Sequence, residues 1–455
     1  MLARGSAPPN IVWLMSDDLG YGELSSFGQT QFRTPHIDRL ASEGVRFTSA
    51  YCGEAVCAPS RGALMTGLHM GHAYIRGNGK KGIGGTDTPL RPGDTTVAEL
   101  LQQAGYYTGL VGKWGLGVNG TTGSAQNKGF NYFFGEPDQT HAHNMYPEFL
   151  LQSSEAVAGR LEEDQYGNFG GCNYTHDLFT DHAVAFLEER ARVPDQPFFL
   201  YVAWTDPHAG GWGSDVEHGN PVPFDGQFNS EHSWPVVERD HASVIQNKCI
   251  CADVGRILRT LQTTGMDNNT IVFFASDNGA SDEGGHRASF FTSSGPLRGV
   301  KRSLYEGGIR TPSSARWPGV IPPAQVSAFP WTFADFLPTA LELASRPDLV
   351  PPGLDGISIV PTLLGQPQSR GDFCLYWEFC TNDLWGRAAR RGRWKAVALS
   401  SAGPTELYDL ERDIGETTDL AARFPAVVRE MEACMDAEHE DSPDWPVGDG
   451  LCVSS

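Results

Sequence analysis

The chain has 455 residues, of which 40% are hydrophobic, so it can bury a large core and is long enough for two domains. The formal net charge is −21 and Lys and Arg form no dense block. This argues against nucleic acid or an anionic membrane surface as a partner, because both need a basic footprint. The longest unbroken apolar run, residues 198–204, is much shorter than the ~20 residues that a membrane span needs, so we expect no transmembrane segment.

Four short apolar runs, each followed by polar residues, predict strands buried on both faces. In chain order they cover residues 11–15, 107–111, 198–204 and 271–275. Helical patterns lie between them, over residues 36–43, 96–104, 180–192 and 243–263. This alternation predicts an α/β sandwich with a mostly parallel central sheet, in which ligands bind beyond the carboxyl ends of the strands.

The pattern changes after residue 370. Proline-rich segments bracket a predicted helix over residues 333–344, and short predicted strands then cover residues 373–379, 394–399 and 406–410. A last predicted helix covers residues 424–438. We therefore expect a catalytic domain over residues 8–370 and a small α+β subdomain over residues 371–455.

Acidic pairs follow two of the predicted strands. Asp17 and Asp18 come after the first strand, and Asp277 and Asn278 come after the last one of the four. A single pair of this kind is more often a turn or a helix cap. Two pairs at equivalent strand ends supply three carboxylates and an amide oxygen, which are the ligands that Ca²⁺ and Mg²⁺ prefer.

A cysteine motif lies between the first two predicted strands. Residues 57–67 read CAPSRGALMTG and resemble the signature of the sulfatase family, in which the cysteine is oxidised to formylglycine and its hydrate attacks sulfate esters. Pro59 is acceptable in the first turn of a helix, whose N-terminus suits an anion, and Arg61 would add charge-assisted hydrogen bonds near Cys57. The alternative is a buried structural cysteine beside a helix.

The resemblance carries expectations for the fold and the cofactors. It implies a large alkaline-phosphatase-like sandwich followed by a small C-terminal domain of antiparallel sheet and helix. It implies a metal held by Asp17, Asp18, Asp277, Asn278 and the modified Cys57, and it favours Ca²⁺ over Mg²⁺. It also implies a formylglycine-generating enzyme as a partner during maturation, and a secreted, endomembrane or lysosomal location.

Two lysines and a histidine match family positions that contact the sulfate. Lys113 and Lys301 resemble the two sulfate-binding lysines, which would neutralise charge on the transferred group. His208 resembles the histidine that hydrogen-bonds sulfate or protonates the leaving alcohol, and we expect nearby Asp206 to help bind substrate. Each of these residues, taken alone, is more often a solvated surface residue.

One position departs from the family pattern Gly-Lys-Trp-His-Leu-Gly, because Gly115 stands where the histidine is expected. That histidine is thought to partner the formylglycine hydrate. We hypothesise that His141 or His143, in a polar loop, fills the vacated space and joins the substrate-binding residues. His36 also stands where the family usually has Asn, which we interpret as a structural variation.

The leading interpretation is an enzyme that hydrolyses sulfate esters of a sulfated carbohydrate or an aryl alcohol. Residues 305–312 resemble arylsulfatase-like and galactosamine-6-sulfatase-like members, and aromatic loops over residues 144–147 and 209–218 could stack on sugars or simply pack. Two alternatives stay open. One is a phosphodiester or phosphonate hydrolase of the same superfamily, and the other is a non-catalytic protein that binds sulfated glycans, which Gly115 suggests.

The cysteines and the start of the chain bear on the compartment. The sequence has nine cysteines, and setting Cys57 aside leaves eight, a number that permits disulfides without demonstrating them. Free buried thiols are an equal alternative. The first residues show no apolar segment of the kind that signal peptides carry, so no signal peptide is visible.

Overall fold

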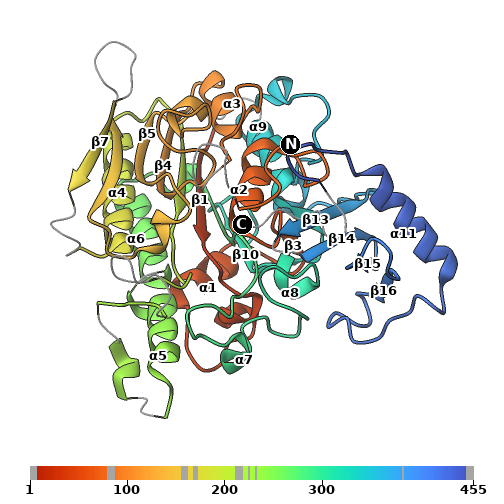
Figure 1. Cartoon of the computed structure of the whole chain (residues 1–455). Helices are drawn as coiled ribbons and strands as arrows, with labels where there is room; N and C mark the ends of the chain where they lie inside the picture. The colour runs from red at the N-terminus through yellow and green to blue at the C-terminus, as the bar shows by residue number, and fades with distance from the viewer. Residues whose placement is uncertain are drawn as a thin grey trace.

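The computed structural model has a large sheet between two layers of helices and a small sheet beside them (Figure 1). It describes residues 8–78, 88–154, 162–167, 173–210, 219–223, 226–230, 233–248, 250–381 and 384–446. Within these ranges, no helix combines the length and the apolar character that crossing a membrane requires.

The large sheet is built around the strands that the four apolar runs predict. In the described residues its order is β11 (Gln325–Ser327), β2 (Val45–Phe47), β10 (Ser313–Arg316), β9 (Thr270–Ser276), β1 (Asn10–Ser16), β8 (Phe198–Ala203), β4 (Tyr107–Lys113), β5 (Tyr132–Glu136), β6 (Phe149–Ser154) and β7 (Glu162–Gly167). The neighbours β9, β1, β8, β4 and β5 run parallel, whereas β10 and β6 pair antiparallel with β9 and β5. The mostly parallel central sheet is confirmed, with the four predicted strands at its centre.

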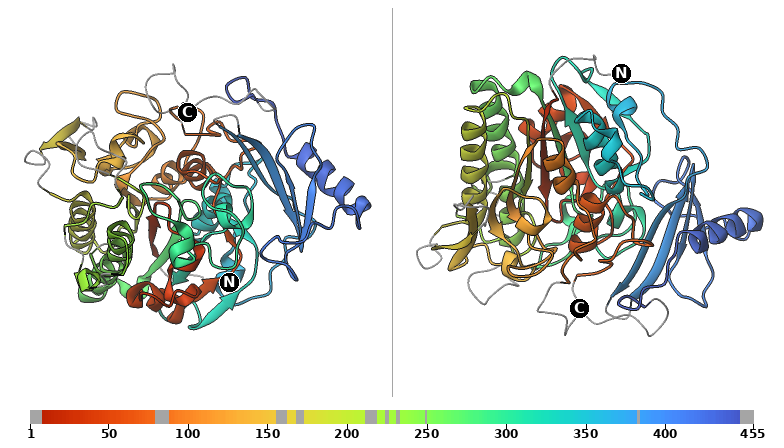
Figure 2. Two further views of the ribbon diagram at one scale, coloured as in Figure 1. Left: turned by 60° about the horizontal axis from the view of Figure 1, so that its bottom comes forward. Right: turned by 90° about the horizontal axis from the view of Figure 1, so that it is seen from above.

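Helices cover both faces of this sheet because its central strands send apolar side chains to both sides. In β1, Trp13 packs into one core, and Val12 and Leu14 pack into the other. The first core also takes side chains from α2 (Cys57–Thr66), α3 (Val97–Gln103) and α9 (Phe336–Leu343). The second takes side chains from α1 (Pro35–Ser42), α4 (Thr175–Arg190) and α6 (Ile250–Thr263) on the opposite face (Figure 2).

The predicted helix over residues 243–263 is interrupted in the structure. Its first residue ends α5 (Val236–Ser243), a π-helical segment follows over Val244–Lys248, and α6 begins at Ile250. Buried Val244 and Ile245 keep the apolar pattern of a helix across the segment. The periodicity therefore predicted one helix, although the backbone hydrogen bonding changes within it.

The small sheet at the C-terminal side is antiparallel, as expected. It consists of β13 (Leu375–Thr381), β14 (Leu384–Arg391), β15 (Trp394–Ala398) and β16 (Glu406–Asp409), and α11 (Pro425–Ala437) packs against it. The Cys374–Cys434 disulfide fastens α11 to the start of β13. Trp377 of β13 enters the core of the large sheet, and its indole N–H donates to the carbonyl of Cys52 at 3.1 Å.

The remaining short elements complete the connections. They are β3 (Ala50–Tyr51), β12 (Trp331–Thr332), α7 (Ala288–Phe291), α8 (Glu306–Ile309) and α10 (Val360–Leu363). β3 and β12 pair in parallel as a separate two-stranded sheet.

Candidate active site

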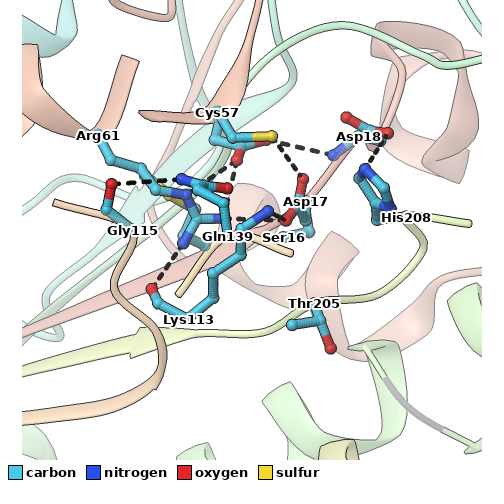
Figure 3. Close-up of polar contacts among 12 residues, drawn as sticks. Ser16, Asp17, Asp18, Cys57, Arg61, Lys113, Gly115, Gln139, Thr205 and His208 are labelled. Carbon is cyan, nitrogen blue, oxygen red and sulfur yellow. Dashed lines mark hydrogen bonds and ion pairs between the residues drawn. The ribbon is translucent and has the colours of Figure 1, made fainter. Parts of the chain in front are cut away.

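Four neighbouring parallel strands end at the edge of the sheet where the candidate site lies. Asp17 follows β1, Asp277 follows β9, Lys113 is the last residue of β4, and His208 lies in the loop after β8. Because parallel strands share one carboxyl edge, these side chains arrive at one place, where Figure 3 shows Asp17, Lys113 and His208. The first turn of α2 brings Cys57 to the same place.

Three carboxylates and an amide lie at the centre of the site. The backbone N–H of Asp18 donates to Asp277 Oδ1 at 3.2 Å, and Asn278 Nδ2 donates to Asp18 Oδ1 at 2.7 Å. Burial, followed by the charges of neighbouring aspartates, raises the pKa of Asp18 and of Asp277 to about 6. Burial acts in the same direction on Asp17, but Lys113 and other nearby cations hold the pKa of Asp17 well below its usual value.

This cluster offers donor atoms that fit a hard divalent cation. One possible ligand atom from each of Asp17, Asp18, Cys57 and His208 lies within 4.8 Å of the others. Asn278 Oδ1 is buried and has no hydrogen-bond partner in the described structure, so its lone pairs remain available for a ligand bond. A cation here would also remove the repulsion between adjacent carboxylates.

Arg61 forms hydrogen bonds that position the aspartates. Its Nε and one terminal nitrogen donate to Asp277 Oδ2 at 3.0 and 2.8 Å, and that nitrogen also lies 3.3 Å from Asp17 Oδ2. Its other terminal nitrogen donates to the carbonyl of Lys113 at 2.8 Å. Arg61 has no solvent exposure, and it connects the ends of neighbouring strands. Its side-chain hydrogen bonds go to these groups rather than to Cys57.

Cys57 is the first residue of α2, the helix that the motif predicts. The helix ends at Thr66, and the next residue, Gly67, has a φ of +72° in the left-handed region that glycine adopts readily. Cys57 Sγ lies 3.3 Å from Asp17 Oδ1 and is 1% exposed. Burial and the charge of Asp17 raise the pKa of the Cys57 thiol well above its usual value, so an unmodified thiol here is protonated and a poor nucleophile.

Two lysines flank the acidic centre. Lys113 Nζ donates to Asp17 Oδ2 at 2.7 Å, and Lys301 Nζ donates to Asp18 Oδ2 at 2.8 Å. His208 Nδ1 lies 2.6 Å from the carbonyl of Ala209, so Nδ1 carries the proton and Nε2 accepts from Lys301 Nζ at 3.0 Å. Burial and the adjacent Lys301 lower the pKa of His208 to about 3, so its ring is neutral near pH 7.

A cavity of about 350 Å³ opens beside Lys301 and His208. It is lined by Asn78, His143, His208, Ala209, Glu283, Gly284, Lys301 and Arg302. Glu283, which sequence reasoning missed, accepts from Lys301 Nζ at 2.8 Å and also pairs with Arg302. An acidic residue just beyond the Asp277 pair, followed by two glycines, was the available signal.

Two predicted substrate-binding residues face other partners. The Asp206 carboxylate is fully buried, accepts from Tyr174 at 2.9 Å, and lies 2.9 Å from His176 Nδ1, so it does not reach the cavity. His141 pairs with buried Glu136 and does not line the cavity. The structure therefore corrects the placement expected for Asp206 and for His141.

Gln139 occupies the space next to Gly115 that we expected His141 or His143 to fill. A Cβ at Gly115, where φ is +72°, would lie 2.0 Å from Gln139 Nε2, and that amide donates to the carbonyl of Gly115 at 3.4 Å (Figure 3). His143 instead stacks on His208, with ring centroids 4.2 Å apart. Gln139 could not be found from sequence, because only the pairing of β4 with β5 brings it over Gly115.

The structure describes one of the two aromatic loops more fully than the other. Tyr146 packs in the core, 6% exposed, with its ring 5.2 Å from that of Tyr174. Most of the loop over residues 209–218 lies outside the described residues. Its proposed stacking on sugars stays a prediction.

An α/β sandwich that gathers a candidate cation site, a cysteine at a helix N-terminus and two lysines at its strand ends is typical of hydrolases that act on anionic esters. The sulfatase family model matches residues 9–345, and the chain belongs to that family.

Sequence relatives agree with this membership. The chain is 34% identical over 398 residues to N-acetylgalactosamine-6-sulfatase of Mus musculus, covering 82% of this chain and 70% of the relative. It is 32% identical over 486 residues to arylsulfatase A of Homo sapiens, covering 95% and 88%. The chain is therefore an enzyme, a sulfuric ester hydrolase.

Solved structures with the same fold cover nearly the whole chain. The structure of Ps i-CgsB has a TM-score of 0.78 at 23% identity and covers 97% of this chain and 95% of that one. A protein of glycosaminoglycan metabolism in Bacteroides thetaiotaomicron has a TM-score of 0.74 at 26% identity, covering 95% and 99%. The expected sulfatase-type, alkaline-phosphatase-like fold is confirmed.

Proposed function

We propose that this sulfuric ester hydrolase removes sulfate from a sulfated sugar, with position 57 as the nucleophile after conversion to formylglycine. The observation that carries the proposal is the convergence of Cys57 and four metal-type ligands with Lys301, which lines an open cavity. These residues come from separate segments of the chain, and only the fold brings the segments together.

Asp17, Asp18, Asp277 and Asn278 would hold the metal, which we propose to be Ca²⁺, with Mg²⁺ as the alternative. The unpartnered Asn278 Oδ1 and the raised pKa of Asp18 and Asp277 support a cation at this place. When bound, the ion would lower the pKa of the attacking hydroxyl and neutralise the sulfate.

Conversion of Cys57 requires a formylglycine-generating enzyme as a maturation partner. In the folded chain Cys57 is 1% exposed and its sulfur lies 3.3 Å from Asp17 Oδ1, so a separate modifying enzyme has no access to this sulfur. We propose that modification takes place before α2 packs against the sheet.

The sulfate would sit between Lys301 and His208 at the cavity wall. The Lys301 ammonium would neutralise charge that develops on the sulfate oxygens, while buried Lys113 keeps Asp17 ionised and oriented. His208 is neutral in the free protein. A bound sulfate would raise the pKa of His208 toward the range in which it can protonate the leaving alcohol.

The substrate class rests on the relatives and on the cavity. Two of the similar proteins are named for N-acetylgalactosamine-6-sulfate hydrolysis, in Mus musculus and in Bacteroides thetaiotaomicron. The cavity volume of about 350 Å³ falls at the lower end of ligand sites, which suits one sugar ring, and Asn78 and Arg302 offer polar groups to its hydroxyls. We therefore propose a sulfated hexosamine at a chain end.

The cysteines support an oxidising compartment for the mature protein. Cys374 and Cys434 form a disulfide, and Cys380 is also disulfide-bonded, whereas Cys52, Cys57 and Cys251 are free and buried. Disulfides persist mainly outside the cytosol. We propose secretion or an endomembrane location.

The decisive experiment combines mass and rate. Mass spectrometry of the peptide that spans Cys57 should show the aldehyde, and the purified protein should hydrolyse an aryl sulfate faster than the phosphate of the same phenol. Cys57→Ala should abolish turnover, whereas Cys251→Ala, which removes another buried free thiol, should keep it. An unmodified peptide with full activity, or a preference for the phosphate, would refute the proposal.

A further inference from the structure

A second group of metal-type ligands lies outside the active site. Glu23 belongs to a short helical turn, Tyr21–Glu23, His241 lies on α5, and His286 precedes α7. These three side chains are at most 4% exposed, and one possible ligand atom from each lies within 4.8 Å of the others. The sequential order of the residues gives no hint of this cluster.

Hydrogen bonds also form on the far side of each ring. His286 Nδ1 lies 2.6 Å from Glu238 Oε2, so Nδ1 is the donor. His241 Nδ1 lies 3.3 Å from Asn220 Oδ1, and the Asn220 amide is oriented by its Nδ2, which donates to two backbone carbonyls at 2.8 and 3.0 Å. In the neutral His286 ring, the Nε2 lone pair therefore faces Glu23, while His241 Nε2 is within hydrogen-bond distance of the Glu23 carboxylate.

His286 Nε2 and Glu23 Oε1 face one another as two acceptors. His241 Nε2 lies 2.6 Å from Glu23 Oε1, and His286 Nε2 lies 4.0 Å from the same oxygen. His286 Nε2 is buried and forms no hydrogen bond in the described structure. A proton on His241 Nε2 satisfies the short contact with Glu23, but the buried lone pair of His286 Nε2 has no such partner and is available to a cation held beside Glu23 and His241.

The charges of the cluster also favour a cation. Glu23 and Glu238 are at most 3% exposed, and in the described residues their ion pairs are with imidazoles alone, with no Lys or Arg. Burying two carboxylates without a counter-charge is costly. One divalent cation would neutralise both while the two rings stay neutral.

We propose that Glu23, His241 and His286 bind a divalent transition-metal ion of the zinc class. Two imidazole nitrogens and one carboxylate form a ligand set that Zn²⁺ prefers and Ca²⁺ does not. Glu238 and Asn220 are the outer hydrogen-bond partners that metal-binding histidines typically have. Ser293 Oγ donates to Glu23 Oε1 at 2.7 Å and so holds this carboxylate in place.

This ion would brace the wall of the active site. Asn220, which orients His241, also binds the carbonyl of His208, and the chain that carries Glu283 into the cavity continues to His286. The site would therefore fix two segments that line the cavity. The proposal stands on its own residues and does not depend on which sulfate ester is hydrolysed.

Another histidine cluster provides a contrast. His69, His72, Asp355 and Glu438 are equally close together. However, His69 Nδ1 accepts the backbone N–H of Gly71 at 3.1 Å, so its Nε2 carries the proton and donates to Glu438 at 3.0 Å. His72 Nδ1 donates to Asp355 at 2.8 Å. Every group there is satisfied without a metal, which makes it a matched control.

The test measures zinc in the full-length protein with Ca²⁺ in excess, so that the Asp17 cluster stays filled. We expect about one tightly bound Zn²⁺ per chain by elemental analysis, with a rise in Tm when zinc is returned to chelator-treated protein. His286→Gln should abolish both effects, and Glu238→Gln, which keeps all three ligands, should weaken zinc binding about 10- to 100-fold. His69→Gln should leave zinc binding unchanged.

Three results would overturn the proposal. They are wild-type protein that neither retains nor rebinds zinc, a His286→Gln variant that binds zinc as tightly as wild type, and a His69→Gln variant that loses it. If His286→Gln does not fold, Glu238→Gln decides by the same measurement. Anomalous scattering at the zinc edge would locate the ion directly.

Discussion

This enzyme has two fully buried charge clusters with different roles. The first is the acidic centre with Asp17 and Lys301. The second, which we call the junction cluster, joins the large and small sheets and consists of Tyr51, Glu306, Arg310, Lys395 and Glu416. In the junction cluster, Lys395 Nζ lies 2.9 Å from Glu306 Oε1 and 3.2 Å from Glu416 Oε1, and none of these side chains is exposed.

The difference lies in what each cluster leaves available. In the junction cluster, Glu306 Oε1 meets Lys395, and Oε2 meets both Arg310 and the hydroxyl of Tyr51. In the active site, the amide oxygen of Asn278 is unpartnered and Lys301 lines an open cavity. Burial of charge alone therefore does not indicate catalysis. What distinguishes the active site is a polar atom without a hydrogen-bond partner, together with a cation that lines a cavity.

The largest expected effect is on stability, at the junction. Burial would raise the pKa of Glu306, but Lys395 and Arg310 outweigh it and bring that pKa to about 2, so the carboxylate is ionised and tightly paired. Glu306→Gln leaves Lys395 with an incomplete set of partners and should lower the free energy of unfolding by about 3–5 kcal/mol in urea titrations. Arg39→Gln, which breaks a half-exposed pair with Glu43, should cost less than about 1 kcal/mol. Equal costs for both variants would contradict the comparison.

The next effect is on catalysis, at the cavity. Lys301→Gln removes the cation that we place against the sulfate, so kcat should fall about 10²- to 10³-fold. Its neighbour Arg302 lines the same cavity, and its side chain is 40% exposed. Arg302→Gln should therefore change kcat by less than about tenfold, since solvent screens its charge. A larger loss in Arg302→Gln than in Lys301→Gln would mean that we have assigned the sulfate to the wrong cation.

A third buried cluster, whose residues do not line the active-site cavity, sharpens the comparison through pH. His176 lies between Asp206 and Asp253, at 2.9 and 3.2 Å, and stacks on Trp204. Burial lowers the pKa of His176, but the two adjacent carboxylates outweigh burial and raise that pKa to about 9. This raised pKa stabilises the fold below pH 6.5, and the contribution is lost as pH rises from 6.5 to about 9. With about 1.4 kcal/mol for each pKa unit, the loss is at most about 3.5 kcal/mol.

Unfolding free energies at pH 6 and pH 9 would test this. The wild type should lose stability across the interval, and His176→Gln should be less stable at pH 6 with a much flatter dependence. kcat measured below the unfolding range should be similar in both proteins, because His176 does not touch the cavity. If the unfolding free energy of His176→Gln depends on pH as steeply as that of the wild type, another group is responsible for the pH dependence.

These clusters also show how far sequence reasoning reaches. β1, β4, β8 and β9 were predictable because burial on both faces requires continuous apolar runs, and their polar ends then converge. β14 was missed because arginines interrupt its apolar pattern, among them Arg390, which donates to the hydroxyl of Tyr51 at 2.5 Å. The type of a residue indicates which chemical role it could have. Whether its side chain lies in the active site depends on contacts with residues far away in the sequence.

Asp206 illustrates the limit. Its segment matches the family pattern, and its backbone carbonyl does accept from the N–H of Asp17 at 3.1 Å. The direction of its carboxylate depends on Tyr174 and His176, which reach it from another helix. No local pattern around residue 206 contains that information.

The smallest expected effect concerns Gly115 and the side chain above it. Gly115→Ala should cost about 1–2 kcal/mol through the left-handed backbone alone, and the new Cβ must also displace Gln139. In a Gln139→Ala background only the backbone cost remains, so the same substitution should be less destabilising there. A double-mutant cycle of unfolding free energies separates the two contributions. If Gly115→Ala costs the same in both backgrounds, Gln139 does not fill this space in solution, and the position left by the family histidine is open to substrate or water.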